Sequence, residues 1–282
     1  MNAIEISNLS KKYSSFTLDN ISFSLPSGSI LGLVGENGAG KSTTINLIMN
    51  VIARDSGLVK VLGTDNQSED FNSVKDNIGV VLDEAYFPEV ITPKNVNVIM
   101  KNTYKHWDEK LYFDYLTRFK LPDRKMFKDF SRGMKMKLAI AVALSHNPKL
   151  LILDEATSGL DPMVRDEILD IFNDFTRDET HSIILSSHIV SDLEKICDYI
   201  AFIHNGKLLF CEEKDRLLDE YAIIKVSKSD FEAIPSEAVK SKKMCSYGVE
   251  ALILKSQVSS AFITEHTRLE DIILFLAKGE NN

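Results

Sequence analysis

The sequence predicts an α/β fold with a second, smaller domain, and three features carry that prediction. A glycine-rich loop at Gly35–Thr43 lies between a short apolar run, Ile30–Val34, and a stretch whose apolar residues have helical spacing. Further short apolar runs end in acidic or polar residues, as buried strands do where they carry a ligand site at one edge of a sheet. Beyond about residue 215 the composition changes and no such pattern recurs, which indicates an accessory domain at 216–282.

Composition and charge narrow the class of protein. Hydrophobic residues make up 44% and charged residues 26% of the chain, ordinary values for a globular protein. The net charge of -8 argues against a broad nucleic-acid-binding surface. No run approaches the ~18 apolar residues of a membrane span, and the start lacks the pattern of a signal peptide. The three cysteines, none in a C-x-x-C pair, suit a reducing cytoplasm better than a disulfide framework.

The first elements are predicted to be strands. Ala3–Ile6 and the apolar positions between Phe16 and Phe23 indicate two strands, and the polar stretch Ser10–Ser15 indicates a turn between them. Tyr13 lies in this turn. It is either an aromatic residue that stacks on a nucleotide base or an ordinary surface residue, and both interpretations remain open.

The glycine-rich loop matches the phosphate-binding pattern G-x-x-x-x-G-K-[ST] from Gly35 to Ser42. Its glycines let the backbone curl so that N–H groups point at phosphate oxygens, and the following helix N-terminus adds partial positive charge. Lys41 is expected to reach the β- and γ-phosphates, and the Ser42 hydroxyl to bind Mg²⁺. The flanking strand and helix disfavour a chance match. The candidate nucleotide-binding residues are Gly35, Glu36, Asn37, Gly38, Ala39, Gly40, Lys41, Ser42 and Thr43.

A second apolar run, Ile78–Leu82, predicts a strand that ends at Asp83 and Glu84. These carboxylates are either part of a site at the sheet edge or members of a solvated loop. Thr92 and Pro93 then open a helix-rich region, about residues 84–146, because a capping residue precedes a proline at the first helical position. Its last helix is predicted at Lys135–Ser145.

The strongest acidic signal follows this region. Leu150–Leu153 predicts a buried strand, and Asp154 and Glu155 come directly after it. Asp154 suits Mg²⁺, as in nucleotidases with a phosphate loop, and Glu155 is placed to orient or deprotonate a water molecule. The alternative, two carboxylates that merely cap a strand, is the weaker interpretation downstream of a phosphate loop.

The remaining elements of the first domain follow in order. Asp161 and Pro162 start a helix, and Ser182–Leu185 predicts a strand that leads to His188. A lone histidine is more often structural than catalytic, but its place at the expected site edge favours a functional role here. The stretch from Tyr199 to Phe210 predicts a hairpin around an Asn-Gly turn. In the second domain, strands are predicted at Ala222–Val226, Ala251–Leu254 and Ala261–Thr264, and a closing helix at Thr267–Ala277.

Together these motifs resemble the ATP-binding subunit of an ABC transporter over residues 1–215. Gly35–Thr43 resembles the Walker A motif and Leu150–Glu155 the Walker B motif with its catalytic glutamate. The segment Phe130–Met134, here called the signature segment, is similar to the family signature Leu-Ser-Gly-Gly-Gln, which precedes Walker B by about twenty residues as it does here. Ser158–Asp161 is similar to the D-loop, His188 to the switch histidine, and Tyr13 to the adenine-stacking aromatic.

The resemblance implies a phosphate-loop, RecA-like mixed sheet with an N-terminal antiparallel β subdomain, a helical signature subdomain and a small α+β C-terminal extension. It implies that Ser131 and Gly133 contact the γ-phosphate of a partner's ATP. It also assigns Glu155, His188 and Lys41 as catalytic, and Ser42, Asp154 and Asp83 as metal-binding. The chain departs from the pattern at two places: Asp83 stands where the family usually has glutamine, and Arg132 and Met134 replace signature residues.

The implied protein is an ATPase that uses ATP and Mg²⁺ at the cytoplasmic face of the cell membrane. Its partners would be a transmembrane permease on a separate chain and a second ATP-binding subunit in a head-to-tail dimer, with no nucleic acid. The form Ser-Arg-Gly-Met-Lys resembles the single-cassette ABC-2-type branch that exports antibiotics and peptides. Three alternatives stay open: a soluble ABC ATPase acting on ribosomes or DNA, a nucleotide-sensing module without turnover, and an importer.

Overall fold

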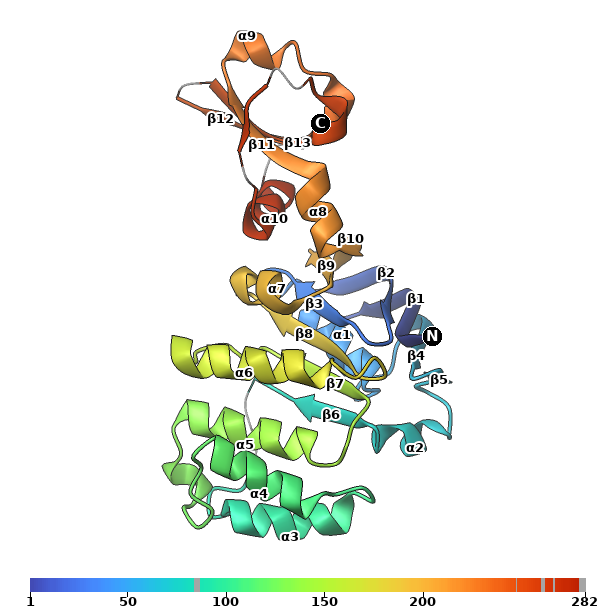
Figure 1. Cartoon of the computed structure of the whole chain (residues 1–282). Helices are drawn as coiled ribbons and strands as arrows, with labels where there is room; N and C mark the ends of the chain where they lie inside the picture. Colours follow the sequence, from blue (N-terminus) through green and yellow to red (C-terminus); the bar gives the residue numbers. More distant parts are fainter. Residues whose placement is uncertain (84–86, 247, 260–261, 266, 279–282) are drawn as a thin grey trace. The chain divides into compact units, whose positions relative to one another are not determined.

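The computed structural model describes residues 1–83, 87–246, 248–259, 262–265 and 267–278 (Figure 1). The chain divides into two compact units, Met1–Phe210 and Cys211–Asn282. The sequence places this boundary five residues later, at 215. Glu84, expected beside Asp83, lies outside the described residues.

The first unit is built on a largely parallel sheet with the strand order β10-β9-β3-β8-β7-β6. Adjacent strands from β9 to β6 pair in parallel, so their carboxyl ends lie at one edge of the sheet. Both faces are covered, which explains why the strands are continuous apolar runs rather than alternating ones. The strands are β3 (Ile30–Val34), β6 (Ile78–Val81), β7 (Leu150–Asp154), β8 (Ser182–Ser187), β9 (Tyr199–His204) and β10 (Lys207–Glu213).

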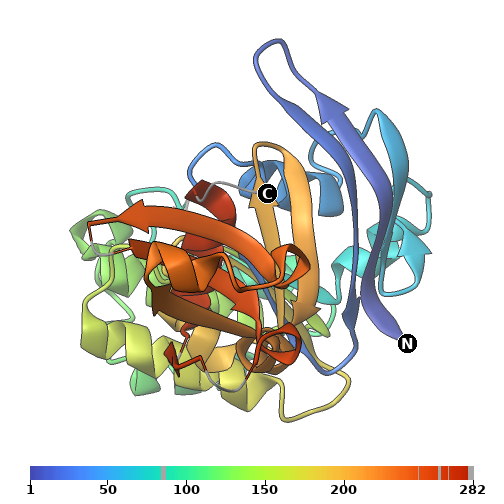
Figure 2. The ribbon, with the colours of Figure 1, turned by 90° about the horizontal axis from the view of Figure 1, so that it is seen from above.

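A second, antiparallel sheet has the order β2-β1-β4-β5, from β1 (Asn2–Lys12), β2 (Thr17–Pro26), β4 (Ser56–Val61) and β5 (Thr64–Asp65). Figure 2 shows β1 and β2 as a pair of long ribbons. The predicted turn at Ser10–Ser15 is wrong in its first half, because β1 continues and Lys12 pairs with Thr17. The turn covers residues 13–16 and is closed by the Tyr13 N–H, which donates to the Phe16 carbonyl at 2.8 Å.

Helices cover the two sheets. The helix α1 (Lys41–Ile48) follows the glycine-rich loop and contacts both β4 and β7, so it lies between the sheets. The helix α7 (Val190–Ile196) packs on β3 and β8 and contacts α6 (Pro162–Phe175), and α2 (Phe71–Lys75) precedes β6. Asp161 caps α6 by accepting from the Val164 N–H at 3.1 Å, which confirms the predicted helix start.

The helix-rich region inserts between β6 and β7 and consists of α3 (Pro93–Thr103), α4 (Glu109–Arg118), η1 (Phe127–Asp129) and α5 (Arg132–Leu144). In Figure 1 the green helices α3, α4 and α5 stack on one another, and α5 is the one that contacts β6. Thr92 and Asn95 form a capping box at the predicted start of α3. The helix α5 begins three residues before the predicted Lys135, because the Ser131 hydroxyl caps it.

The second unit holds an antiparallel sheet of order β12-β13-β11-β14 with helices around it. Its predicted strands are found at β11 and β13. Of the strand expected at Ala261–Thr264, Ala261 lies outside the described residues, and β14 begins at Thr264. The strand β12 was not predicted, because its lysines hide the alternation of Val239 and Ser241 as buried positions. The elements are α8 (Lys214–Glu220), β11 (Tyr221–Val226), α9 (Lys228–Phe231), η2 (Ser236–Ala238), β12 (Val239–Cys245), β13 (Gly248–Leu254), η3 (Lys255–Gln257), β14 (Thr264–Glu265) and α10 (Leu269–Lys278).

None of the helices in the described part of the chain combines the length and the apolarity needed to span a bilayer.

Candidate functional site

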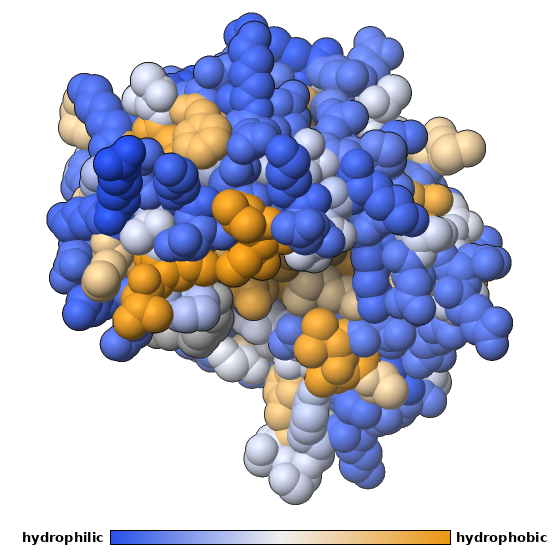
Figure 3. Space-filling view, turned by 90° about the horizontal axis from the view of Figure 1, so that it is seen from below, coloured by the Kyte–Doolittle hydropathy of each residue, from blue (hydrophilic) through white to orange (hydrophobic). Residues whose placement is uncertain are grey.

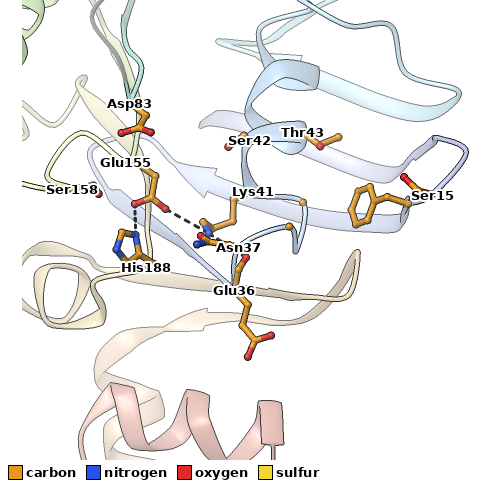
Figure 4. A pocket seen from close by; sticks show the side chains of 13 residues that line it. Ser15, Glu36, Asn37, Lys41, Ser42, Thr43, Asp83, Glu155, Ser158 and His188 are labelled. Carbon is orange, nitrogen blue, oxygen red and sulfur yellow. Dashed lines mark hydrogen bonds and ion pairs between the residues drawn. The ribbon is translucent and has the colours of Figure 1, made fainter.

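A pocket of ≈ 670 Å³ lies where the parallel strands end (Figure 4). The loops after β3, β6, β7 and β8 contribute to it, as expected for the carboxyl edge of such a sheet. Most of the residues that the sequence singled out are therefore brought together, although they come from distant segments. The lining residues are Ser15, Phe16, Glu36, Asn37, Gly38, Gly40, Lys41, Ser42, Thr43, Asp83, Glu155, Ser158 and His188.

The glycine-rich loop is fixed by close packing and by its backbone conformation. A Cβ atom at Gly35 would lie 2.4 Å from the Ile203 carbonyl oxygen, so a side chain does not fit there. Gly38 and Gly40 have φ values of +82° and +115°, in the left-handed region that glycine adopts without a steric penalty. The helix α1 begins directly after Gly40, so its free N–H groups face the pocket.

Lys41 is held inside this loop. Its side chain is 6% exposed, and its Nζ donates to the carbonyl oxygens of Gly35 at 2.8 Å and of Glu36 at 3.3 Å. Nζ also lies 3.5 Å from Glu155 Oε1. The Glu36 side chain points away from this contact (Figure 4). The cation is thus already placed at the pocket, with a carboxylate as its counter-ion.

Glu155 links Lys41 to His188. Its other oxygen, Oε2, lies 2.7 Å from His188 Nδ1, and Figure 4 shows the carboxylate between the two partners. Its backbone has a φ of +52°, which is uncommon for a residue with a side chain and costs about 1–2 kcal/mol. The strained turn aims the carboxylate into the pocket rather than along the strand.

Ser186, to which no role was assigned from the sequence, supports both acidic residues. Its buried hydroxyl donates to Asp154 Oδ1 and accepts from the Glu155 backbone N–H at 3.1 Å. The register of β7 and β8 places Asp154 opposite Ser186 and so makes both contacts possible. A hydroxyl at the end of an apolar strand, beside a neighbouring strand's carboxylate, is the signal that would have identified it.

The aromatic residue at the pocket is Phe16, together with Ser15. Tyr13 is not among the lining residues; the residue is 40% exposed, and its ring centroid lies 5.9 Å from Lys11 Nζ. Phe16 was assigned only to a strand from the sequence, because the position of the tight turn that presents it was not apparent. Gly35, Ala39 and Asp154 also fall outside the lining set.

The signature residues lie in a separate hollow of ≈ 360 Å³, which includes Ser131, Gly133 and Gly159. The chain therefore does not bring Ser131 and Gly133 to its own glycine-rich loop. Ser131 accepts from the Met134 N–H at 3.3 Å, and Gly133 lies in the first turn of α5. Between them, Arg132 pairs with Asp83, which lines the larger pocket.

The residues expected to bind a metal ion are Ser42, Asp154 and Asp83. Among the described residues, no three His, Cys, Asp or Glu side chains cluster as a preformed metal site. Mg²⁺ commonly takes one or two carboxylates and completes its shell with water and substrate phosphates. Ser42, Asp154 and Asp83 therefore fit Mg²⁺ only when a nucleotide supplies further oxygens.

Comparisons with known proteins agree with this geometry. The sequence profile of the ABC transporter family matches residues 18–158. The lantibiotic transport ATP-binding protein SrtF of Streptococcus pyogenes is 35% identical over 216 residues, which cover 75% of this chain and 91% of that protein. The chain belongs to the ABC transporter family.

Other ABC proteins extend the match. The bacitracin transport ATP-binding protein BcrA of Enterococcus faecalis is 35% identical and covers 73% of this chain and 68% of its own. YcbN of Bacillus subtilis, an ABC transporter ATP-binding protein, is 28% identical over 99% of this chain and 98% of its own. A solved ATP-binding subunit of an ABC transporter has a TM-score of 0.70 and 26% identity, and covers 76% of this chain and 91% of its own.

These matches confirm the resemblance that the motifs indicated, and they confirm the α/β fold class. This ABC protein is an ATP-binding, ATP-hydrolysing subunit that powers transport, and such subunits associate with the membrane.

Proposed function

We propose that this ABC ATPase powers the export of a peptide antibiotic or a related amphipathic compound through a separate transmembrane subunit. The cargo class rests on the relatives, because SrtF and BcrA are named for lantibiotic and bacitracin transport. The direction rests on the resemblance of Ser131–Lys135 to the exporter branch. The chemistry rests on one observation, the chain of contacts from Lys41 through Glu155 to His188 at the edge of the glycine-rich loop.

The glycine-rich loop and the start of α1 bind the ATP phosphates. Its N–H groups and the helix terminus surround the β- and γ-phosphates, and Lys41 exchanges its contacts with the loop carbonyls for phosphate oxygens. Glu155 loses its cationic partner at that moment and becomes free to accept a proton from water. His188 holds the other carboxylate oxygen and keeps Glu155 in the pocket.

Ser42 and Asp154 are the residues that would hold Mg²⁺, with Ser186 fixing the orientation of the Asp154 carboxylate. Bound Mg²⁺ would neutralise charge on the phosphate oxygens. Asp83 lines the same pocket, and one of its oxygens pairs with Arg132.

The other side of the γ-phosphate comes from a second ATP-binding subunit in a head-to-tail dimer. This follows from the position of Ser131 and Gly133 in a hollow of their own, on a helix N-terminus suited to an anion. A structural neighbour with 21% identity and a TM-score of 0.66 is a dimeric ATP-binding cassette with ADP and phosphate bound. ATP closes the pair of subunits, and hydrolysis reopens it.

The permease docks on the helix-rich region, at the cytoplasmic face of the membrane. Figure 3 looks at the molecule from the α3 side and shows apolar side chains gathered in a strip beside a hollow. Exposed apolar side chains of this region are Val90, Val98, Ile99 and Met126. Surfaces of this kind mark protein interaction sites, and the region also carries the Asp83 end of the ATP pocket.

The test is the substitution Glu155→Gln in the purified protein. We expect ATP binding to persist, phosphate release to fall by about 100-fold or more, and a dimer to accumulate with ATP in size-exclusion chromatography. Glu220→Gln, on α8 in the second unit, is the matched control and should leave all three unchanged. Normal phosphate release by Glu155→Gln would remove Glu155 from the mechanism, and a protein that never pairs would remove the dimer.

A further inference from the structure

The two positions at which the sequence departs from the family pattern form an ion pair with each other. Arg132 Nη2 lies 2.8 Å from Asp83 Oδ1, although the residues are 49 positions apart. Asp83 follows β6, and Arg132 is the first residue of α5. One departure puts a negative charge where the family usually has a neutral glutamine, and the other supplies a positive charge in contact with it.

Arg132 contacts a third motif as well. A Cβ atom at Gly159 would lie 2.7 Å from Arg132 Nη1 and 2.9 Å from its Cζ, so the guanidinium lies against this glycine, which has a φ of +66°. The guanidinium thus lies between the loop after β6 and the loop after β7. A glycine at 159 leaves room for it, whereas a larger residue would displace it.

The pair lies between the two hollows. Asp83 and the glycine-rich loop line the pocket of ≈ 670 Å³. Arg132 lines the hollow of ≈ 360 Å³ together with Ser131 and Gly133. The two side chains are 54% and 52% exposed, so the pair by itself contributes little to the stability of the fold. Its effect is expected on charged ligands instead.

The pair affects the balance of charges at the pocket. The Glu155 carboxylate already lines the pocket, and a triphosphate brings up to four further negative charges. Without Arg132, the Asp83 carboxylate would repel the phosphates. The repulsion would be strongest for the terminal phosphate, which in the proposed function binds beside Lys41 and Glu155. Arg132 cancels this charge without entering the glycine-rich loop.

We propose that Arg132 is a positioning residue that compensates the charge of Asp83 and so sets the affinity for ATP over ADP. The proposal rests on the proposed function, since it requires a triphosphate in this pocket. Because Arg132 and Ser131 line the same hollow, the charge state around Asp83 also acts on the surface that is offered to a partner subunit.

The experiment is a double-mutant cycle with direct binding measurements. Calorimetry would measure affinities for a non-hydrolysable ATP analogue and for ADP, both with Mg²⁺, in the full-length wild type, Arg132→Ala, Asp83→Asn and the double variant. Arg132→Ala should lower the affinity for the ATP analogue about three- to tenfold at low ionic strength, with a smaller loss for ADP. The double variant should regain the wild-type affinity to within about twofold, and added salt should reduce the loss.

A repeat without Mg²⁺ separates this role from direct metal binding. With charge compensation, the loss in Arg132→Ala persists in the presence of a chelator, because the repulsion acts on the phosphates. If Asp83 serves only as a metal ligand, Asp83→Asn weakens binding with Mg²⁺ but not with chelator, and adding Arg132→Ala changes nothing further. That result, or equal affinities of Arg132→Ala and wild type, would overturn the proposal.

Two controls keep the outcome interpretable. Arg216→Ala breaks an exposed arginine–carboxylate pair of similar length, 2.7 Å from Nε to Glu220 Oε1 in the second unit, and should not alter nucleotide affinity. Arg132→Lys retains a positive charge and should retain most of the affinity, and thermal unfolding checks that each variant is folded. Failure of the wild type to bind ATP would refute the proposed function itself, whereas normal wild-type binding with no effect of Arg132→Ala refutes only the pair.

Discussion

The glycine-rich loop and the signature segment are the two segments to which the proposed function assigns nucleotide contacts, and they are built in opposite ways. The loop is closed on itself: Lys41 is 6% exposed and bonded to the loop's own carbonyls, and Gly35 packs against β9. The signature segment is open, with Ser131 and Arg132 exposed at the start of α5, where Ser131 caps the helix and Arg132 forms a surface ion pair with Asp83.

This difference between the closed loop and the open signature segment indicates which half of the proposed nucleotide site a single chain completes. A phosphate loop made of backbone groups needs no partner, because its donors are fixed by the fold. The signature segment lines a separate hollow, so under the proposed function it needs a partner subunit to bring it a nucleotide. Substitutions in the loop should alter ATP binding by the free subunit, whereas substitutions in the signature segment should alter nucleotide affinity and the pairing of subunits.

The largest expected effect is at Lys41. Removing its amine in Lys41→Ala deletes a charge-assisted bond to the phosphates, worth about 1.5–3 kcal/mol, so ATP affinity should fall about ten- to 150-fold. Calorimetry on the purified subunit measures it. Lys195→Ala is the control, because that lysine pairs with Asp166 on a helix surface away from the pocket. An unchanged affinity would show that the loop is not the phosphate site.

The second prediction compares two glycines of the same loop. Gly35→Ala forces a Cβ to within 2.4 Å of the Ile203 carbonyl, whereas Gly38→Ala meets nothing within 4 Å and has only its φ of +82° to overcome. We expect the larger loss from Gly35→Ala, which should lower the free energy of unfolding by about 3 kcal/mol or more through backbone displacement, against about 1–2 kcal/mol for Gly38→Ala. Urea unfolding measures both. An equal loss would mean that close packing does not hold the loop in place.

The same contrast explains how far the sequence could predict the site. The loop was identified because its residues are contiguous and each has a local role, so the motif itself contains the geometry. Glu155 and His188 were found because both follow apolar strands that end at one edge of the sheet. These predictions required only the order of the strands in the sheet, which the presence of a phosphate loop indicates.

Contacts between distant segments could not be predicted. The departures at Asp83 and Arg132 were noticed separately, but nothing in the sequence indicates that they meet across 49 residues. Ser186 was missed because its role depends on the register between β7 and β8. Phe16 was missed because the turn after β1 begins three residues later than its polar residues suggested. In each case packing, rather than local propensity, decides.

The third prediction concerns Ser186. Ser186→Ala removes the hydroxyl that orients Asp154 and accepts from the Glu155 N–H, so the Mg²⁺ concentration for half-maximal ATPase activity should rise about tenfold. Ser182→Ala is the matched control on the same strand. Its buried hydroxyl accepts from the Gly28 N–H at 3.0 Å, far from the carboxylates. Both variants should lose some stability, but only Ser186→Ala should change the Mg²⁺ requirement; the same change in both would reduce Ser186 to a structural residue.

The smallest expected effect is at the C-terminal end of α5, the helix that begins in the signature segment. His146 follows α5 and is buried, with Nε2 at 3.1 Å from the Ile78 carbonyl, Nδ1 at 3.3 Å from the Val142 carbonyl, and the Tyr104 ring stacked on it at 4.0 Å. Burial lowers the pKa of His146 below its ordinary value of 6.5, although both carbonyls and Asp76 oppose that shift. The unfolded chain therefore takes up this proton more readily than the folded one.

It follows that the free energy of unfolding should fall as the pH drops through 6.5 towards the lower pKa of the folded state. Because His146 joins α5 to β6, amide hydrogen exchange at about pH 5.5 should accelerate in α5 before it does in α1. His146→Gln should flatten this pH dependence, whereas Tyr104→Phe, which keeps the stacked ring, should retain it. Equal acceleration in α1 and α5 would mean that the two halves of the site share one stability, and the contrast between them would then lie in exposure alone.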